Sequence, residues 1–206
     1  MIWGEGDRVS VNVLVAVISE GGVAIGAYDD GRIVGSAFGF ATHEPGVLHS
    51  HYMAVHPEYR SQGLGERIKR AQAEWCVENG YTSMRWTYDP LQLVNAHLNL
   101  NKLGALGVTY HVNHYGALGG INGGMPSDRL TVQWWFGADP IAVDHARATD
   151  IEVPDATPDH VRAASPEAFA ARYAIREAMQ HTVGHGWAVV GVDIAARRYR
   201  IAPVVG

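Results

Sequence analysis

The stretch that decides the fold is Val55-His56-Pro57-Glu58-Tyr59-Arg60-Ser61-Gln62-Gly63-Leu64-Gly65, which joins an apolar strand to an amphipathic helix. The proline marks a turn, and an Arg-x-x-Gly-x-Gly loop leads directly into the start of the helix. A helix N-terminus offers unpaired backbone N–H groups and a partial positive charge, which suit a phosphate or pyrophosphate. Because Gly63 and Gly65 lack side chains, an anion can approach the backbone there. The spacing predicts an anion-binding loop that is neither Walker A nor the dinucleotide pattern.

Apolar runs separated by turn signals predict the elements around this loop. We expect helices over Ser10–Glu20, from Leu64 to Asn79-Gly80 and over Leu93–Leu103, and strands over Val23–Tyr28, Arg32–Ala41, Val47–Val55, Ser83–Tyr88, Gly107–Tyr115 and Arg129–Phe136. This order implies an α/β (α+β) fold with a mixed, mostly antiparallel sheet. The helix after the loop then forms the crossover between two parallel strands.

The last third of the chain has a different pattern. Ala138–Pro158 is rich in Asp and Pro and predicts a connector with little regular structure. Ser165-Pro166-Glu167 predicts a helix start, and Trp187–Val192 and Arg198–Val204 predict a hairpin. A segment of about seventy residues rarely holds a core alone. We therefore expect residues 138–206 to be a helix–hairpin appendage packed on a domain formed by residues 1–137.

Composition excludes several functional classes. The 206 residues are 47% hydrophobic and 18% charged, with a formal net charge of −5. This balance is that of a globular protein and argues against nucleic acid as the main partner, which needs clustered Lys and Arg. The single cysteine, Cys76, cannot form an internal disulfide. No membrane-spanning stretch and no signal peptide are evident, so we expect a cytoplasmic protein without a membrane partner.

The loop resembles the pyrophosphate loop of the GNAT superfamily of acyl-CoA N-acyltransferases, written Arg/Gln-x-x-Gly-x-Gly/Ala. Asn95-Ala96-His97-Leu98-Asn99-Leu100-Asn101-Lys102-Leu103-Gly104-Ala105 resembles a later helix of the same family. The wider pattern looks like a little-characterised bacterial branch of predicted GNAT proteins. The resemblance covers Gly4 to Phe136 and implies the GNAT fold. One departure is that the family usually begins with a strand and a further helix, whereas only nine residues precede Ser10.

The resemblance implies acetyl-CoA or another acyl-CoA as co-substrate and a small amine as acceptor. In the family, the backbone of the strand before the loop pairs with the pantetheine arm, which here implicates Met53 and Val55. The loop residues implied to hold the pyrophosphate are Arg60, Ser61, Gln62, Gly63, Leu64, Gly65 and Glu66. The resemblance also implies cofactor contacts for Asn95 and Asn99 in the later helix.

Acyl transfer to an amine needs a base that removes a proton from the ammonium group. His51 is our candidate, because histidine titrates near neutrality and His51 shares a strand face with His49 at period two. The alternative is a structural, hydrogen-bonded histidine. The tyrosine with which many relatives protonate the departing thiolate is Leu100 here. Tyr88 and Tyr110 are the hydroxyl groups that could replace it, and for both the alternative is simple packing.

The segment Gly116–Asp128 is long for a hairpin loop, and the resemblance places it beside the acceptor pocket. Arg129 at its exit is a candidate clamp for a carboxylate on the acceptor, and the alternative is an ion pair with Asp128 or Asp89. His111 and His114 would point to opposite faces of a strand, so we expect no metal.

A second functional class stays open beside the enzyme. With Leu100 in the tyrosine position, the chain could be a non-catalytic acyl-CoA-binding or assembly module. A homodimer is compatible with either function. Release of free thiol in the presence of amines distinguishes the two classes.

Overall fold

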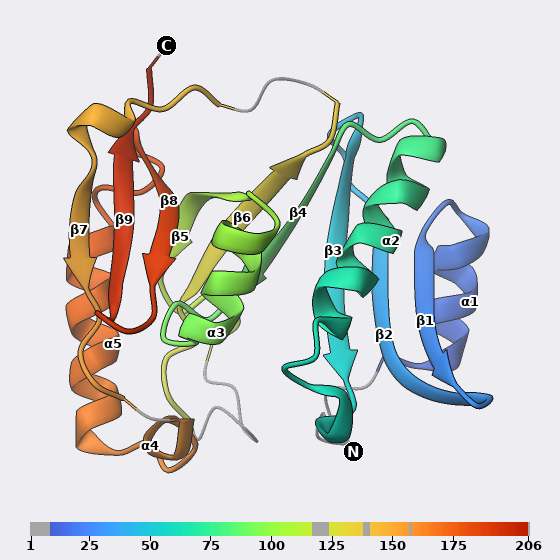
Figure 1. Ribbon diagram of the computed structural model, residues 1–206, viewed down its shortest axis with the longest axis horizontal. Coiled ribbons are helices and arrows are strands. Elements are labelled where there is room, and N and C mark those ends of the chain that lie inside the picture. Colours follow the sequence, from blue (N-terminus) through green and yellow to red (C-terminus); the bar gives the residue numbers. More distant parts are fainter. Residues whose placement is uncertain (1–8, 117–123, 138–140, 157, 206) are drawn as a thin grey trace. The chain divides into compact units, whose positions relative to one another are not determined.

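The computed structural model describes residues 9–116, 124–137, 141–156 and 158–205, and Figure 1 shows their helices and strands. The chain divides into two compact units, one formed by residues 1–86 and 135–138 and the other by residues 87–134 and 139–206. The fold is mixed α/β, with mostly antiparallel strands and one parallel pair, as predicted.

The first unit is built on a meander that runs directly into the crossover helix. Strands β1 (Val23–Asp29), β2 (Arg32–Ala41) and β3 (Val47–Val55) pair antiparallel, and β3 pairs parallel with β4 (Ser83–Tyr88). A short 3-10 turn, η2 (Pro57–Tyr59), and helix α2 (Leu64–Glu78) connect β3 to β4. The parallel crossover predicted from the sequence is confirmed.

Helix α1 (Val11–Ser19) precedes the meander. It begins where Ser10 accepts a hydrogen bond from the Val13 N–H, a typical N-cap. None of its side chains is buried.

Helix α2 packs closely on the sheet of this unit. At Gly35 of β2, an added Cβ would lie 2.6 Å from Ile68 Cδ1, so glycine is what permits the approach. The helical spacing predicts that α2 buries Leu64, Ile68, Ala71 and Trp75, but Leu64, Ala71 and Trp75 are only half-buried. The buried side chains are those of Ile68, Lys69, Gln72, Ala73 and Cys76. Two polar residues therefore lie in the buried face of this helix.

In the described residues of the second unit, five strands pair antiparallel in the order β6-β5-β8-β9-β7. Their bounds are β5 (Leu106–His111), β6 (Arg129–Trp135), β7 (Thr149–Glu152), β8 (Trp187–Asp193) and β9 (Arg198–Pro203). The helices are α3 (Leu93–Ala96), the π-helical turn η3 (His97–Lys102), the 3-10 turn η5 (His145–Arg147), α4 (Pro158–Arg162) and α5 (Pro166–Met179). Helix α5 begins at the N-cap Ser165 and contacts β7 (Figure 1).

One local prediction in this unit is wrong in its bounds, and two need a local detail added. The connector Ala138–Pro158 is not irregular throughout, because Thr149–Glu152 pairs with β9. The helix over Leu93–Leu103 changes from α to π geometry at His97. The strand predicted over Gly107–Tyr115 ends at His111.

The predicted hairpin of Trp187–Val192 and Arg198–Val204 is confirmed. The division into a domain of residues 1–137 and an appendage stays a prediction. The start Met1–Glu5 and most of the loop Gly116–Asp128 lie outside the described residues. Among the helices that are described, none has both the length and the apolar character of a membrane span.

Candidate functional site

The loop before α2 has a backbone shape suited to an anion. Gly63, the N-cap residue of α2, adopts a left-handed conformation with φ 78°, and Ser61 does so with φ 60°. Left-handed residues alternating with right-handed or extended ones turn successive N–H groups into one concavity, which binds anions. Ser61, Gln62 and Gly63 are exposed, and nothing lies within 4 Å of a Cβ built on Gly63. The start of α2 is therefore open to a ligand.

Side chains of the loop hold its shape. The Arg60 Nε donates to the Val55 carbonyl at 3.2 Å, and the Gln62 Nε2 donates to the Glu58 carbonyl at 2.7 Å. Glu66 in the first turn of α2 pairs with Arg70 at 2.9 Å, which offsets a negative charge beside the loop. In this arrangement, the backbone N–H groups at the start of α2 are left for an anion.

The edge of β3 offers a second binding element. Its parallel register with β4 covers Val47–His49 only, and β3 continues to Val55. The His56 N–H donates to the Val34 carbonyl at 2.8 Å, so His56 points its N–H toward β2. Successive residues of a strand point their backbone groups to opposite sides. Val55 and Met53 therefore direct their N–H and C=O groups away from β2. The Val55 carbonyl accepts from Arg60, and an extended ligand could pair with the Val55 N–H and with both groups of Met53.

A β-bulge lies in the middle of β3. Phe38 is paired with Tyr52 and Gly39 with Ser50, which leaves His51 as the extra residue of β3. The bulge changes which face of the sheet the following side chains occupy. The rings of His49 and His51 lie 5.9 Å apart on one face, as predicted.

His51 has the properties of a proton acceptor. Although part of the ring reaches solvent, burial of the rest lowers its pKa below the ordinary value, so the imidazole is neutral at pH 7. Its contacts in the described part of the chain are with aromatic rings, including Phe40 at 5.6 Å and Phe38 at 6.3 Å, and none is a hydrogen bond. This geometry favours the base over the structural, hydrogen-bonded histidine, and the role of base stays a prediction.

The two candidate acids lie in the second unit and are both buried. The Tyr88 hydroxyl donates to the Tyr199 hydroxyl at 3.3 Å, which donates to the Pro90 carbonyl at 2.8 Å. The Tyr110 hydroxyl donates to Asp128 at 2.7 Å. Burial raises the pKa of both Tyr88 and Tyr110 well above the ordinary value. Because both hydroxyls are buried and hydrogen-bonded, packing is favoured over proton donation, and the role of acid stays a prediction.

Arg129 is half-buried beside the long loop. Its Nη1 donates to the Asp128 backbone carbonyl at 2.9 Å, and its guanidinium carbon lies 5.4 Å from the centre of the Tyr115 ring. Burial lowers its pKa below the ordinary arginine value, which still leaves the group charged. Among the described residues, no carboxylate lies within ion-pair distance of Arg129.

Asp89 and Asp128, the two acids considered as partners of Arg129, pair with arginines of helix α5 instead. Asp89 binds Arg172 through two hydrogen bonds of 2.8 and 2.6 Å, and Asp128 binds Arg176 through two of 2.9 and 2.8 Å. Sequence reasoning missed both arginines, because an ion pair across 83 or 48 residues of chain leaves no local pattern. These bonds leave Arg129 available for another carboxylate.

The expectation for His111 and His114 rested on a strand that is shorter than predicted. Asn113 adopts φ 49° and donates its N–H to Asp128 Oδ1 at 2.9 Å, which turns the chain after His111. The two rings consequently lie 4.5 Å apart and do not point to opposite faces. In the part of the chain that is described, no group of three or more potential metal ligands is found.

The later helix contributes two predicted cofactor contacts. Asn95 is exposed on α3, whereas Asn99 is buried in the π-helical turn. Leu100, in the position of the family tyrosine, is 4% exposed. The structure thus gathers Met53, Val55, the loop and His51 in the first unit, while Tyr88, Tyr110, Arg129, Asn95 and Asn99 belong to the second.

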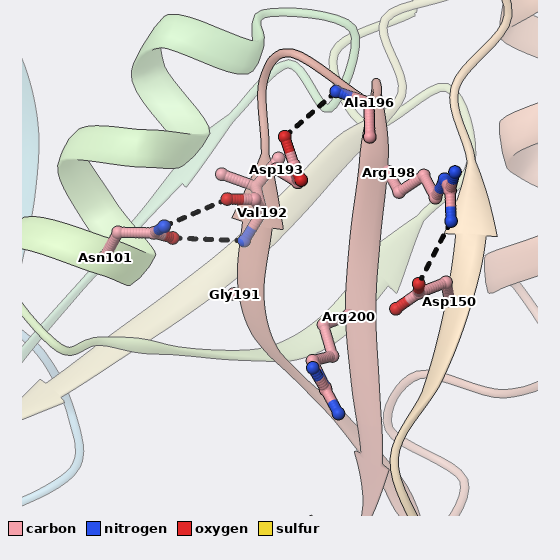
Figure 2. Close-up of a pocket in the computed structure, with 8 residues that line it drawn as sticks. All are labelled: Asn101, Asp150, Gly191, Val192, Asp193, Ala196, Arg198 and Arg200. Atoms are coloured by element: carbon pink, nitrogen blue, oxygen red, sulfur yellow. Dashed lines mark hydrogen bonds and ion pairs between the residues drawn. The ribbon is translucent and has the colours of Figure 1, made fainter.

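A pocket of about 360 Å³ lies on the second unit, lined by Asn101, Asp150, Gly191, Val192, Asp193, Ala196, Arg198 and Arg200 (Figure 2). Asn101 forms two hydrogen bonds with the backbone of Val192, and Asp150 lies 3.6 Å from Arg198. None of the predicted site residues lines this pocket. Its polar groups are largely engaged with one another, so we assign it no role in catalysis.

Comparison with known proteins gives a family match over the first part of the chain. Residues 9–104 match the profile of the Acetyltransferase (GNAT) family. No curated protein matches the chain.

Several solved structures share the fold. The ribosomal-protein-S18-alanine N-acetyltransferase from Escherichia coli has 15% identity and a TM-score of 0.54, over 66% of this chain and 83% of that one. The IAA acetyltransferase from Bacillus cereus has 14% identity and a TM-score of 0.51, over 62% and 85%. A putative acetyltransferase from Salmonella typhimurium, solved with its cofactor acetyl-CoA, has 17% identity and a TM-score of 0.50, over 61% and 72%. At these identities the likeness establishes the fold.

Proposed function

We propose that the chain transfers an acyl group, most simply acetyl, from CoA to a small amine, because residues 9–104 match the Acetyltransferase (GNAT) family. Proteins of this family use acetyl-CoA as acyl donor. The acyl group passes directly from the thioester to the amine while both substrates are bound.

The observation that carries the proposal is the pairing of an open loop with an open strand edge. The left-handed Gly63 and the start of α2 offer N–H groups to the pyrophosphate. The backbone groups of Met53 and Val55 point away from β2, where the pantetheine arm can pair with them like an added strand. Both elements belong to the first unit and are joined by the Arg60–Val55 hydrogen bond.

The chemistry needs one proton acceptor. A neutral His51 at the β3 bulge takes a proton from the acceptor ammonium, which frees the nitrogen lone pair to attack the thioester carbonyl. The departing thiolate has a modest pKa, so it takes its proton from solvent without a dedicated acid. The buried Leu100 is compatible with this route.

For the acceptor we favour an amine that carries a carboxylate. Arg129 is a fixed cation whose neighbouring acids are held by Arg172 and Arg176, so it can bind a substrate carboxylate through two parallel hydrogen bonds. A polyamine would meet repulsion at this position.

A thiol-release assay tests the proposal. Acetyl-CoA is incubated with amino acids, other acidic amines, neutral amines and polyamines, and free CoA is measured against reactions without amine. We expect amine-dependent thiol release and an acylated product by mass spectrometry. Binding of acetyl-CoA without turnover for any amine would contradict the enzyme.

That outcome would support the second candidate, a non-catalytic acyl-CoA-binding module. The observation that favours this candidate is the absence of a proton donor at Leu100, together with the engaged hydroxyls of Tyr88 and Tyr110.

A further inference from the structure

Lys69 lies in the buried face of α2 and is 3% exposed. Its Nζ donates to Ser50 Oγ at 2.7 Å and lies 3.7 Å from the centre of the Trp86 ring. Ser50 Oγ in turn donates to Gln72 Oε1 at 2.7 Å. Within the described residues, Lys69 has no acidic partner, and Gln72 Nε2 has no hydrogen-bond partner.

The position of this cluster is defined by the strand register. The parallel pairing of β3 with β4 ends at His49 and Arg85. Ser50 is thus the first residue of β3 beyond the pairing, and Trp86 is the first residue of β4 beyond it. Lys69 contacts both, so its side chain bridges the two strands at the point where their pairing stops.

A buried lysine without a carboxylate partner is costly for the fold. Removing the ammonium group from water disfavours the charged form, and burial lowers the pKa of Lys69 to about 7. The neighbouring buried positions of α2 hold Ile68, Ala73 and Cys76, and an apolar side chain would fill the site of Lys69 without this cost. Strongly perturbed ionisable groups cluster at functional sites.

No neighbouring charged group in the described residues accounts for the burial of the Lys69 ammonium group. Cys76 is the one ionisable neighbour that shifts its pKa, and burial raises the Cys76 thiol pKa to about 12, so the thiol is neutral. On β4, Arg85 pairs with Glu44. On β3, the rings of His49 and His51 lie together with Phe40, whereas Ser50 bonds to α2.

We propose that Lys69 is a positioning residue for the acyl transfer, which holds Ser50 and Trp86 at the end of the strand pairing and thereby fixes the His51 bulge and the open edge of β3. The inference rests on the function proposed above. The ammonium form performs this task, because it donates to Ser50 and is attracted to the face of the Trp86 ring. The neutral amine loses the attraction to the ring.

The test compares Lys69→Met with the wild type across pH 6 to 9. At pH 6 we expect kcat to fall roughly tenfold to a hundredfold, as for small displacements of reacting groups, with the Kd for acetyl-CoA unchanged within about threefold. The ratio of wild-type to variant kcat should shrink as the pH rises above 7, because the wild type then loses its ammonium group. Taking the ratio cancels the ionisation of His51 and of the acceptor, which both enzymes share.

Two variants serve as controls for Lys69→Met. Lys69 and Lys102 are the two lysines of the sequence, and the exposed Lys102→Met should leave kcat and its pH dependence unchanged. Ser50→Ala removes the hydrogen-bond acceptor and keeps the lysine, so it should lower kcat by a smaller factor.

A ratio that stays constant with pH, or a loss confined to acetyl-CoA binding, would overturn the role of Lys69. If the wild type shows no turnover with any amine, the proposed function is wrong, and the inference about Lys69 is wrong with it.

Discussion

Replacing Lys69 by methionine should stabilise the fold below pH 7 and have little effect at pH 10. Methionine is an unbranched side chain only one atom shorter than lysine, and it places no charge between Ser50 and Trp86. The folded protein protonates Lys69 only below about pH 7, whereas the unfolded chain does so up to the ordinary pKa of 10.5. Between these values the unfolded state binds more protons, so the stability of the wild type rises with pH across this window.

The magnitude follows from the two pKa values. At 1.36 kcal/mol for each tenfold change in proton affinity, the difference between 10.5 and about 7 corresponds to about 5 kcal/mol of destabilisation below pH 7. Methionine also loses the hydrogen bond to Ser50, about 1 kcal/mol, and the attraction to Trp86, about 1 to 2 kcal/mol. The net gain of the variant at pH 6 is therefore about 2 to 3 kcal/mol, or roughly 5 to 10 °C in Tm for a chain of this size.

Urea unfolding of wild type and Lys69→Met at pH 6, 8 and 10 measures this gain, with Lys102→Met as the control that should show no pH-dependent difference. Lysines labelled with carbon-13 at Cε give two NMR signals, and the signal absent from Lys69→Met should titrate near pH 7. A variant that is less stable than the wild type at pH 6, or a difference that does not change with pH, would refute the reasoning.

Three further predictions concern single side chains. Asp89→Asn leaves the Arg172 guanidinium, 1% exposed, without its carboxylate, and thermal unfolding should show a loss of about 3 to 5 kcal/mol; a loss below about 1 kcal/mol would contradict the buried pair. His51→Ala should lower kcat roughly tenfold to a thousandfold without changing the Kd for acetyl-CoA. His49→Ala, on the same face, is the matched control. Equal kcat for both variants and the wild type would show that His51 has only a structural role. Arg129→Gln should lower kcat/KM at least about tenfold for amines that carry a carboxylate and leave amines without one unaffected; an unchanged preference would remove Arg129 from the acceptor site.

Much of the fold could be predicted from local patterns. The apolar runs of β2, β3 and β4 match the observed bounds, because turn signals mark their ends. The glycine loop was predicted because a left-handed turn at a helix start selects glycine, and Gly63 has that conformation.

The errors arise where tertiary contacts override the local pattern. The strand after Leu106 stops at His111 because Asp128, far along the chain, accepts the Asn113 N–H. Lys69 and Gln72 are not among the residues predicted to be buried in α2, and their burial depends on a serine of β3 and a tryptophan of β4 that no helical periodicity reveals. The bulge at His51 results from the register between two strands, which the sequence of one strand does not specify.

The most direct test of the central claim is acetyl-CoA binding to the loop, measured by calorimetry on wild type, Gly63→Asp and Gly80→Asp. The two glycines flank α2 with φ of 78° and 80°, and nothing lies within 4 Å of a Cβ added to either. Both substitutions therefore impose a similar backbone strain, but only Gly63→Asp places a carboxylate against the pyrophosphate at the helix N-terminus. We predict that Gly63→Asp abolishes binding while Gly80→Asp binds like the wild type. Equal binding by both variants would contradict the assignment of this loop as the CoA site.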